Sequence, residues 1–382
     1  MRIALAHPYS WPEVRRGAER VLHDLAWALR TREHEVEIVT GTPGSTASDV
    51  VEEVPVHRRH HHARWDVRGL SRYETFGVEA FPWVLSRRHD LVIALSPSAA
   101  IASSLAGRRT VFYAMGWPTA QWWEFRPMEA RMFRAALRLS RATAVLSNAA
   151  ADSVESLTGS RPSVLPAGIR LEAFPVPERA RSGPPTVLFA SWAEEKGKGL
   201  DLLLEAFALL LADEPDARLL LAGGGDPRWA LERLDPVARA MVSASMQVVG
   251  SPSQPISPAT FASAHVTVLP SQMESFGLVL LESLACGTPV VGSAVGGLLD
   301  VAGGCDVARL VPHADVGALH HALREAFEMA GDPVTATRAR SHAATFDWRT
   351  VIGPLHATFY DGVANGGDSS TEPRRHEVAR SN

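Results

Sequence analysis

The sequence predicts an α/β protein made of two doubly wound parallel sheets, and three observations favour this fold. The chain has 382 residues, enough for two domains of about 150 residues each. Short apolar strands alternate with amphipathic helices in both halves of the chain, which is typical of parallel βαβ units. A proline-rich stretch, Pro162–Pro185, lies between the two halves and is predicted to connect them.

The first half begins with an apolar strand over Ile3–Ala6, followed by a loop with proline and glycine. An amphipathic helix is expected over Glu19–Arg30, because its apolar side chains recur at helical spacing. Further strands of this half are predicted at Glu35–Thr40, Leu91–Leu95, Thr110–Tyr113 and Ala144–Leu146.

In the second half the same alternation restarts after the connector. Strands are predicted at Thr186–Phe189, Arg218–Ala222, Val248–Val249, Val266–Leu269 and Val290–Gly292, with helices at Leu200–Leu211 and Leu278–Ala285. We therefore place two Rossmann-like domains at residues 1–168 and 169–345. Residues 346–365 form a further helical segment, and the polar tail 366–382 is expected to be disordered.

Composition excludes several classes of protein. Apolar residues make up 46% and charged residues 21% of the chain, which argues against wholesale disorder. The 38 basic and 42 acidic side chains give a net charge of −4, without the basic excess of a nucleic-acid-binding protein. Two cysteines, Cys286 and Cys305, cannot build a disulfide scaffold. With no signal peptide or apolar run of about 18 residues, we expect a cytoplasmic protein.

Lysine is rare and clustered. The two lysines of the chain, Lys196 and Lys198, lie in one short loop, whereas arginine supplies all the other basic side chains. This clustering favours a functional role for the loop, because a lysine ammonium is a compact point charge that arginine does not reproduce.

The most informative segment runs from Leu269 to Gly297. A predicted strand is followed by a loop with Glu274, and a helix then begins near Leu278 and carries Glu282. Free amides at the start of such a helix can bind an anion. Gly277 would let the backbone approach a ligand closely. The alternative interpretation is an ordinary strand-to-helix turn with two surface glutamates.

This segment closely resembles the C-terminal signature of the family-4 retaining glycosyltransferases, here Glu274-SFGLVLL-Glu282-SLACGTPVV. Other segments resemble the same family, and they occur in the same order. They are the N-terminal strand, glycine loop and helix, then LPAGIRLEAF, KGKGLDLLLEAFALL and LLLAGGGD. The resemblance therefore covers about residues 1–365. It implies the GT-B fold, with two Rossmann-like domains facing a cleft and a C-terminal helix that crosses back to the N-domain. The N-domain would bind the acceptor and the C-domain the nucleotide-sugar donor.

The resemblance also implies roles for single residues. Glu274 and Lys198 would be catalytic, with Glu274 on the donor-sugar hydroxyls, and Glu282 would hold the nucleotide ribose. The diphosphate would be bound by Gly17 and the backbone amides of Ser275, Phe276, Gly277 and Leu278, with Lys198 as the matching lysine and Lys196 as an alternative shifted by two residues.

The sequence departs from the family at two positions. Ser191 and Trp192 stand where an arginine is usual, so one charge that neutralises phosphate is missing. Met115 stands where many members have a histidine near the donor sugar. Because no Asp-x-Asp triplet occurs, the helix dipole and lysine would replace a metal ion, and no metal or other cofactor is expected.

The implied reaction is transfer of a hexose-type sugar from a UDP- or GDP-sugar to an acceptor hydroxyl with retention of configuration. A natural-product acceptor and a cell-envelope lipid or glycan acceptor both remain open. The alternatives are a nucleotide-sugar epimerase or hydrolase of the same fold and a catalytically silent nucleotide-sugar-binding subunit. A dinucleotide-binding enzyme is disfavoured, because the string Gly223–Asp226 lacks the G-x-G-x-x-G spacing.

Aromatic residues follow the predicted strands of the N-domain, where loops border the ligand crevice of open α/β sheets. We expect acceptor contacts from Trp11, Met115, Trp117, Trp122 and Trp123, although core packing is the alternative. Adjacent Trp122 and Trp123 cannot easily enter one core face together.

Basic side chains gather at two places in the N-domain. The segment His57–Arg72 is interpreted as a solvated basic loop, since its consecutive histidines give poor geometry for a metal ion. Arg131, Arg134, Arg138 and Arg141 form a helical stripe. The stripe is either a solvated face or a peripheral contact with the anionic inner surface of a membrane.

The last apolar segment, Thr345–Val363, fits the returning helix. Asp347 can cap its start. An apolar stripe of Val351, Leu355 and Phe359, with Ile352 on the neighbouring row, is expected to pack against the N-domain.

Overall fold

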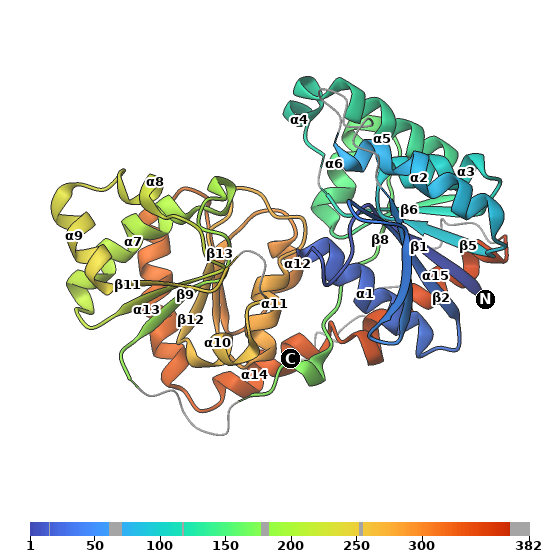
Figure 1. Ribbon diagram of the computed structural model, residues 1–382. Helices are drawn as coiled ribbons and strands as arrows, with labels where there is room; N and C mark the ends of the chain where they lie inside the picture. The colour runs from blue at the N-terminus through green and yellow to red at the C-terminus, as the bar shows by residue number, and fades with distance from the viewer. Residues whose placement is uncertain (15, 61–70, 117, 177–182, 252–254, 367–382) are drawn as a thin grey trace.

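The computed structural model describes residues 1–14, 16–60, 71–116, 118–176, 183–251 and 255–366, and it shows two α/β lobes side by side (Figure 1). In the first lobe the strands are β1 (Arg2–Ala6), β2 (Glu35–Thr42), β3 (Ala47–Val51), β4 (Val54–His60), β5 (Leu91–Ala94), β6 (Thr110–Ala114), β7 (Ala142–Val145) and β8 (Ser163–Val164). They form one sheet in the order β3-β4-β2-β1-β5-β6-β7-β8, in which β3 is antiparallel to β4 and the other pairs are parallel.

Helices cover both faces of this sheet. They are α1 (Gly17–Arg30), α2 (Arg72–Ser86), α3 (Pro97–Leu105), α4 (Ala120–Phe125), α5 (Pro127–Leu139) and α6 (Asn148–Thr158). Strand β1 packs against helices on both faces of the sheet, because successive side chains of a strand point to opposite faces. Ile3 and Leu5 pack with α1, whereas Ala4 and Ala6 pack with α2 and α3.

In the second lobe the strands are β9 (Thr186–Phe189), β10 (Arg218–Ala222), β11 (Met246–Val249), β12 (Val266–Leu269), β13 (Val290–Ser293) and β14 (Ala308–Val311). The order is β11-β10-β9-β12-β13-β14, and the neighbouring strands in this order are parallel. The helices are α7 (Leu200–Asp213), α8 (Arg228–Leu231), α9 (Pro236–Ser245), α10 (Pro258–Ser263), α11 (Leu278–Ala285), α12 (Leu298–Ala302), α13 (Val316–Gly331) and α14 (Thr335–Ala344).

The predicted α/β fold with two parallel sheets is confirmed, and β9, β10, β12 and α11 have the predicted bounds. The interpretation of the basic segment as a loop is wrong for residues 57–60. These residues belong to β4, because they pair with β2 on one side and β3 on the other. Residues 61–70 of that segment and residues 367–382 of the tail lie outside the described residues.

The chain ends by returning to the first lobe. A π-helical turn, Trp348–Ile352, leads into α15 (Gly353–Ala364), which packs against α1 (Figure 1). Asp347 caps the turn as predicted, its carboxylate accepting from the Arg349 amide at 3.3 Å. The His356 ring Nε2 lies 2.9 Å from the Pro166 carbonyl oxygen, so the returning segment is joined to the connector.

The predicted apolar stripe is wrong by one residue for Val351, Leu355 and Phe359, whereas Ile352, predicted on the neighbouring row, is buried. Val351 is exposed, and Leu355 and Phe359 are only partly buried. The buried row is Trp348, Ile352, His356 and Tyr360. Its spacing of four residues continues through the π-helical turn, and it includes a buried histidine that an apolar pattern does not count.

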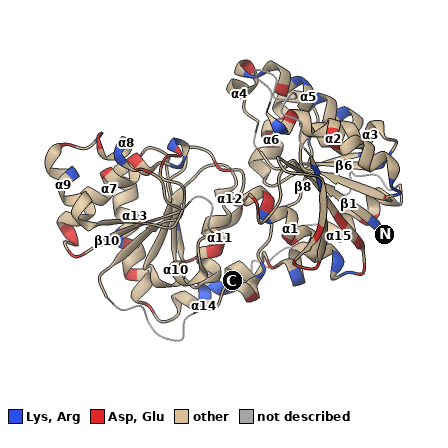
Figure 2. Cartoon of the chain, in the orientation of Figure 1, with Lys and Arg blue, Asp and Glu red and all other residues tan. Residues whose placement is uncertain are grey.

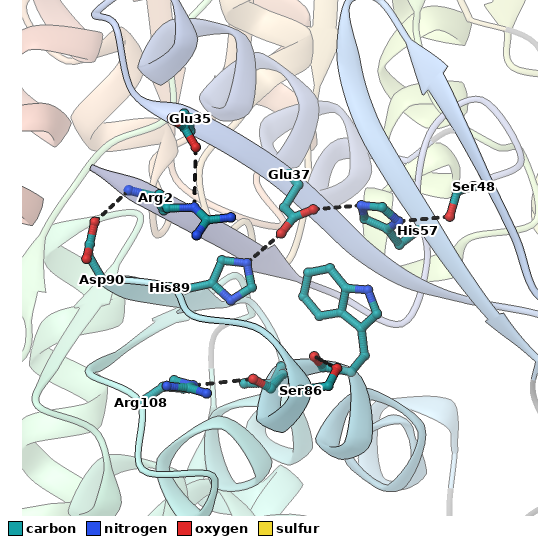
Figure 3. Close-up of polar contacts among 11 residues, drawn as sticks. Arg2, Glu35, Glu37, Ser48, His57, Ser86, His89, Asp90 and Arg108 are labelled. Carbon is teal, nitrogen blue, oxygen red and sulfur yellow. Dashed lines mark hydrogen bonds and ion pairs between the residues drawn. The ribbon is translucent and has the colours of Figure 1, made fainter.

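A partly buried polar cluster lies near the amino end of β2 in the first lobe (Figure 3). The Glu37 carboxylate lies 2.7 Å from Nε2 of His57 and 2.6 Å from Nε2 of His89. Trp83 stacks on His89 with ring centroids 5.2 Å apart. Burial works to raise the pKa of Glu37, but the two histidines hold it below its usual range. The cluster ties β2, β4 and α2 together.

Candidate functional site

A cavity of about 250 Å³ lies between the two lobes, at the carboxyl ends of both sheets. It is lined from the first lobe by Gly17, Ala18, Val21, Met115, Leu146 and Ala167, and from the second lobe by Ser191, Lys198, Leu269, Glu274, Ser275, Phe276, Gly277, Leu278 and Val279. In each sheet the strand order reverses at this point, between β1 and β5 and between β9 and β12. Such a switch point is where open α/β sheets bind ligands.

The loop between β12 and α11 is shaped by two glycines. Gly277 has φ 109° and directly precedes α11, and a Cβ there would approach Leu298 Cδ2 at 2.5 Å. A Cβ on Gly297 would lie 2.4 Å from the Ser275 carbonyl oxygen. The Gly297 amide also donates to the Glu274 carbonyl at 2.8 Å. These close approaches fix the loop that carries residues 274–277 to the cavity wall.

Lys198 and Glu274 form an ion pair on that wall, with Nζ 2.8 Å from Oε2. Gly199, with φ 75°, lets the backbone pass so close to Pro270 that a Cβ would lie 2.1 Å from its carbonyl oxygen. Burial works to lower the pKa of Lys198, but Glu274 and Glu195 raise it above its usual value. The ammonium is therefore charged at neutral pH, beside a carboxylate that can accept from hydroxyl groups.

Two helix N-termini meet at the cavity. Gly17 is the first residue of α1 and Leu278 is the first residue of α11. A Cβ built on Gly17 would lie 3.4 Å from Cδ1 of Leu278, so the two helix starts touch across the lobes. Free amides and helix dipoles from both lobes thus converge with Lys198 on one space, which suits a ligand with several negative charges.

Glu282 lies one turn further along α11 and is partly buried. It interacts electrostatically with Arg20, which lies one turn along α1 and whose Nε is 3.3 Å from Oδ2 of Asp24. Burial raises the pKa of Glu282 to about 7, with Arg20 opposing the shift and Asp24 adding to it. Glu282 does not itself line the cavity, but it follows the lining residues Leu278 and Val279 by four and three residues along α11, a spacing that places side chains on one face of a helix.

Of the two lysines, the structure brings only Lys198 to the cavity. Lys196 is exposed, and its ammonium lies 5.6 Å from the ring centroid of Trp229. Lys196 does not line the cavity, so its alternative role as the donor-binding lysine stays a prediction that this arrangement does not support. Ser191, at the position of the usual arginine, lines the cavity but carries no charge. Its neighbour Trp192 packs on Gly225 and is half-exposed.

The residues predicted to contact the acceptor differ in where the structure places them. Met115 lines the cavity, while Trp117 lies outside the described residues. Trp123 is buried against Phe133, with ring centroids 5.7 Å apart, so the arrangement gives no support to its predicted contact with the acceptor. Trp122 points outward. The expectation that the adjacent pair cannot share one core face is confirmed.

Trp11 is partly buried and is not among the cavity-lining residues. It follows β1 as expected, but its loop turns toward α1, where its backbone interacts with His23. Its predicted contact with the acceptor has no support in this arrangement.

Sequence reasoning missed several cavity residues. Ala18, Val21, Leu146, Ala167 and Val279 are small or apolar, and no chemical signal distinguishes them from core residues. Their position after a strand or in the first turn of a helix was the available signal. The sequence also contains no sign of a contact between the lobes. The Asp300 carboxylate accepts hydrogen bonds from the backbone amide of Asn148, at 3.0 Å, and from the side-chain amide of the same residue.

Within the described ranges, no group of three or more His, Cys, Asp or Glu side chains is arranged to hold a metal ion. No helix among the same residues is long and apolar enough to span a bilayer.

Comparisons with known proteins agree with this geometry. Residues 15–173 match the family described as Glycosyltransferase Family 4, and residues 172–342 match that described as Glycosyl transferases group 1. The chain is 28% identical to a phosphatidyl-myo-inositol mannosyltransferase of Propionibacterium freudenreichii, with 94% of each chain covered.

Two solved structures share the architecture. Sucrose-phosphate synthase from Thermosynechococcus elongatus superimposes with a TM-score of 0.78 at 22% identity, covering 96% of this chain and 100% of that one. Anabaena Alr3699/HepE in complex with UDP and glucose gives a TM-score of 0.74 at 18% identity, covering 94% and 100%. The fold is therefore GT-B. Together with the two family matches, this shows that the chain belongs to the family-4 glycosyltransferases.

Proposed function

We propose that the protein transfers a hexose-type sugar from a nucleotide diphosphate sugar, UDP- or GDP-linked, to an acceptor hydroxyl with retention of configuration and without a metal ion. The observation that carries the proposal is the convergence of Lys198, Glu274 and the starts of α1 and α11 on one cavity. The Anabaena neighbour that holds UDP and glucose has the same fold, which supports a nucleotide-sugar donor.

The diphosphate would lie between the two helix starts. Amides of Ser275–Leu278 and of Gly17 would donate to its oxygens, and the Lys198 ammonium would offset its charge as the anomeric bond breaks. Such preorganised charge acts on the transition state more than on the ground state, because the leaving diphosphate gains negative charge only as the bond loosens. The cavity thus supplies the charge that a metal ion would otherwise supply.

Glu274 would accept hydrogen bonds from hydroxyls of the donor sugar, and Glu282 from the two ribose hydroxyls. The ion pair with Lys198 fixes the orientation of the Glu274 carboxylate before substrate binds. The acceptor hydroxyl would then attack the oxocarbenium-like carbon on the face that the diphosphate leaves, and its proton would pass to a departing phosphate oxygen. No protein nucleophile is needed in this route.

Two alternatives are tested by the same experiment. A hydrolase or epimerase of this fold would consume donor without any acceptor at full rate, and a silent subunit would bind donor without turnover. We expect slow sugar release from the donor alone, acceleration by acceptor, and an α-linked product from an α-linked donor by NMR. An inverted product would refute the retaining route.

The site assignment predicts different defects for the two glutamates. Glu282→Ala should weaken nucleotide binding and Glu274→Ala should mainly lower turnover, each by about 10- to 150-fold for one lost charged hydrogen bond. Calorimetry and initial rates separate the two effects. Unchanged kinetics in both variants would overturn the assignment.

A further inference from the structure

The outer end of the first lobe exposes three large apolar side chains close together in sequence. Trp122 and Phe125 of α4 are 36% and 77% exposed, and Met128 in the first turn of α5 is 48% exposed. Large apolar side chains that gather at one place on a surface mark an interaction site more often than scattered ones do. We call these residues, together with the exposed Arg131, Arg134 and Arg138 of α5, the α4–α5 face.

Local sequence explains why these side chains point outward. Thr119 caps α4 through its side chain, and Pro127 occupies the first turn of α5. Trp123 and Phe133 pack into the core between the helices and the sheet. Each helix thereby anchors one row of side chains inward, and the row on the opposite side of each helix must face solvent or a partner.

The arginines of this face are free to meet a partner. Arg131 and Arg138 make no ion pair with any residue in the described ranges, and Arg134 lies over the Trp123 ring with its guanidinium carbon 4.3 Å from the centroid. Figure 2 shows basic residues, in blue, along α5. Residues 1–168 carry 21 arginines and 17 acidic residues, so the whole lobe is positive while the second lobe is negative.

A solvated helix face accounts for the arginines but not for exposed tryptophan, phenylalanine and methionine beside them. Apolar side chains flanked by cations are the combination that binds the surface of an anionic bilayer, because the rings enter the acyl boundary while the guanidinium groups pair with headgroups. We propose that the α4–α5 face docks the protein on an anionic lipid bilayer.

The position of the face relates it to the cavity. The chain runs from Met115, which lines the cavity, to Thr119, which caps α4, in four residues. Figure 1 shows α4 and α5 on the side of the first lobe away from α1 and α15. Docking there would hold the first lobe against the membrane and leave the second lobe in solution. If the proposed transfer reaction is correct, an acceptor presented by the membrane would reach the cavity from this side.

The test is vesicle sedimentation of the full chain. We expect binding to vesicles of phosphatidylcholine mixed with phosphatidylglycerol and much weaker binding to phosphatidylcholine alone. The double variant R131Q/R138Q should lose about thirtyfold in binding, at about fivefold for each arginine. The variant F125S/M128S should lose binding at high salt, where the apolar contribution remains.

A matched control removes the same charge elsewhere. Arg218 and Arg338 of the second lobe are exposed, and R218Q/R338Q should bind like the unaltered protein. Equal losses in both double variants, or no preference for anionic vesicles, would overturn the proposal. Self-association of the unaltered protein through this face without vesicle binding would overturn it as well. A thermal shift with UDP checks that each variant is folded. Because this readout is separate, failure of docking is distinguished from failure of donor binding.

Discussion

Protonation of Glu282 should control donor binding near neutral pH. In the proposed site the Glu282 carboxylate must be ionised to accept both ribose hydroxyls, and burial raises its pKa to about 7. Below that value each pH unit should therefore weaken binding about tenfold, and binding should level off above it. Between about pH 8 and pH 6 the dissociation constant of a nucleotide sugar should rise about tenfold.

Calorimetry with an intact nucleotide sugar is the appropriate assay, because free UDP carries a terminal phosphate that titrates in the same range. Glu282→Gln should bind weakly at every pH and show no such slope. Arg20→Gln removes the charge that opposes the shift and leaves Asp24 unopposed, so its midpoint should move to higher pH. A surface variant, Glu232→Gln, should retain the profile of the unaltered protein.

The same carboxylate affects folding with the opposite sign. Its pKa in the folded state lies above its ordinary value, so the folded protein binds more protons and loses stability as pH rises through about 7. Glu282→Gln should therefore raise the melting temperature at about pH 8 while it weakens donor binding. A flat binding profile between pH 6 and pH 8, or an equal slope in Glu282→Gln, would refute the reasoning.

Four further predictions follow from other parts of the structure. Lys198→Ala should lower turnover by about a hundredfold or more in initial-rate assays, whereas Lys196→Ala, which only loses a contact with Trp229, should change it little; equal losses would contradict the placement of the ion pair. Turnover should survive treatment with a chelator, and an absolute requirement for Mn²⁺ or Mg²⁺ would count against charge neutralisation by the helix starts. A chain that ends at Gly366 should stay soluble and active, while one that ends before Thr345 should be insoluble in expression trials, because α15 then no longer covers α1; a soluble, active product of the shorter chain would exclude this role. Glu37→Gln should lower the melting temperature at about pH 7. The difference from the unaltered protein should shrink as pH falls through the lowered pKa of Glu37, because the stabilisation needs the ionised carboxylate. A difference that does not change with pH would show that the charge of Glu37 is not its cause.

The sequence predicts best the elements whose signal is local. Strands β9 and β12 are short apolar runs next to turn residues, so their bounds follow from composition and length. Strands β3 and β4 were missed because β3 is exposed and β4 carries charged side chains, and the pairing of β4 with β2 is a long-range property. The buried row of α15 was misplaced because His356, a polar residue, occupies a core position.

For the site, the motif spacing predicted which segments meet at the cavity. It did not predict which of two nearby candidate residues in a segment takes the functional position. Lys198 and Lys196 are two residues apart, and only the turn ending at Gly199 decides which ammonium faces Glu274. Trp122 and Trp123 likewise differ only in helix phase. Arg20 and Asp24 pair locally along α1, but their approach to Glu282 of α11 depends on how the two lobes meet, and no local pattern encodes that.

The returning helix has a consequence for synthesis of the protein. The first lobe is assembled from both ends of the chain, since α15 covers α1 and contacts the connector at Pro166. The second lobe is continuous from β9 to α14 and precedes α15 in the chain, so all of its own elements are made before α15 is available. The lobe that is translated first is therefore the one that is finished last. Until α15 emerges, the surface of α1 that it later covers stays available to chaperones.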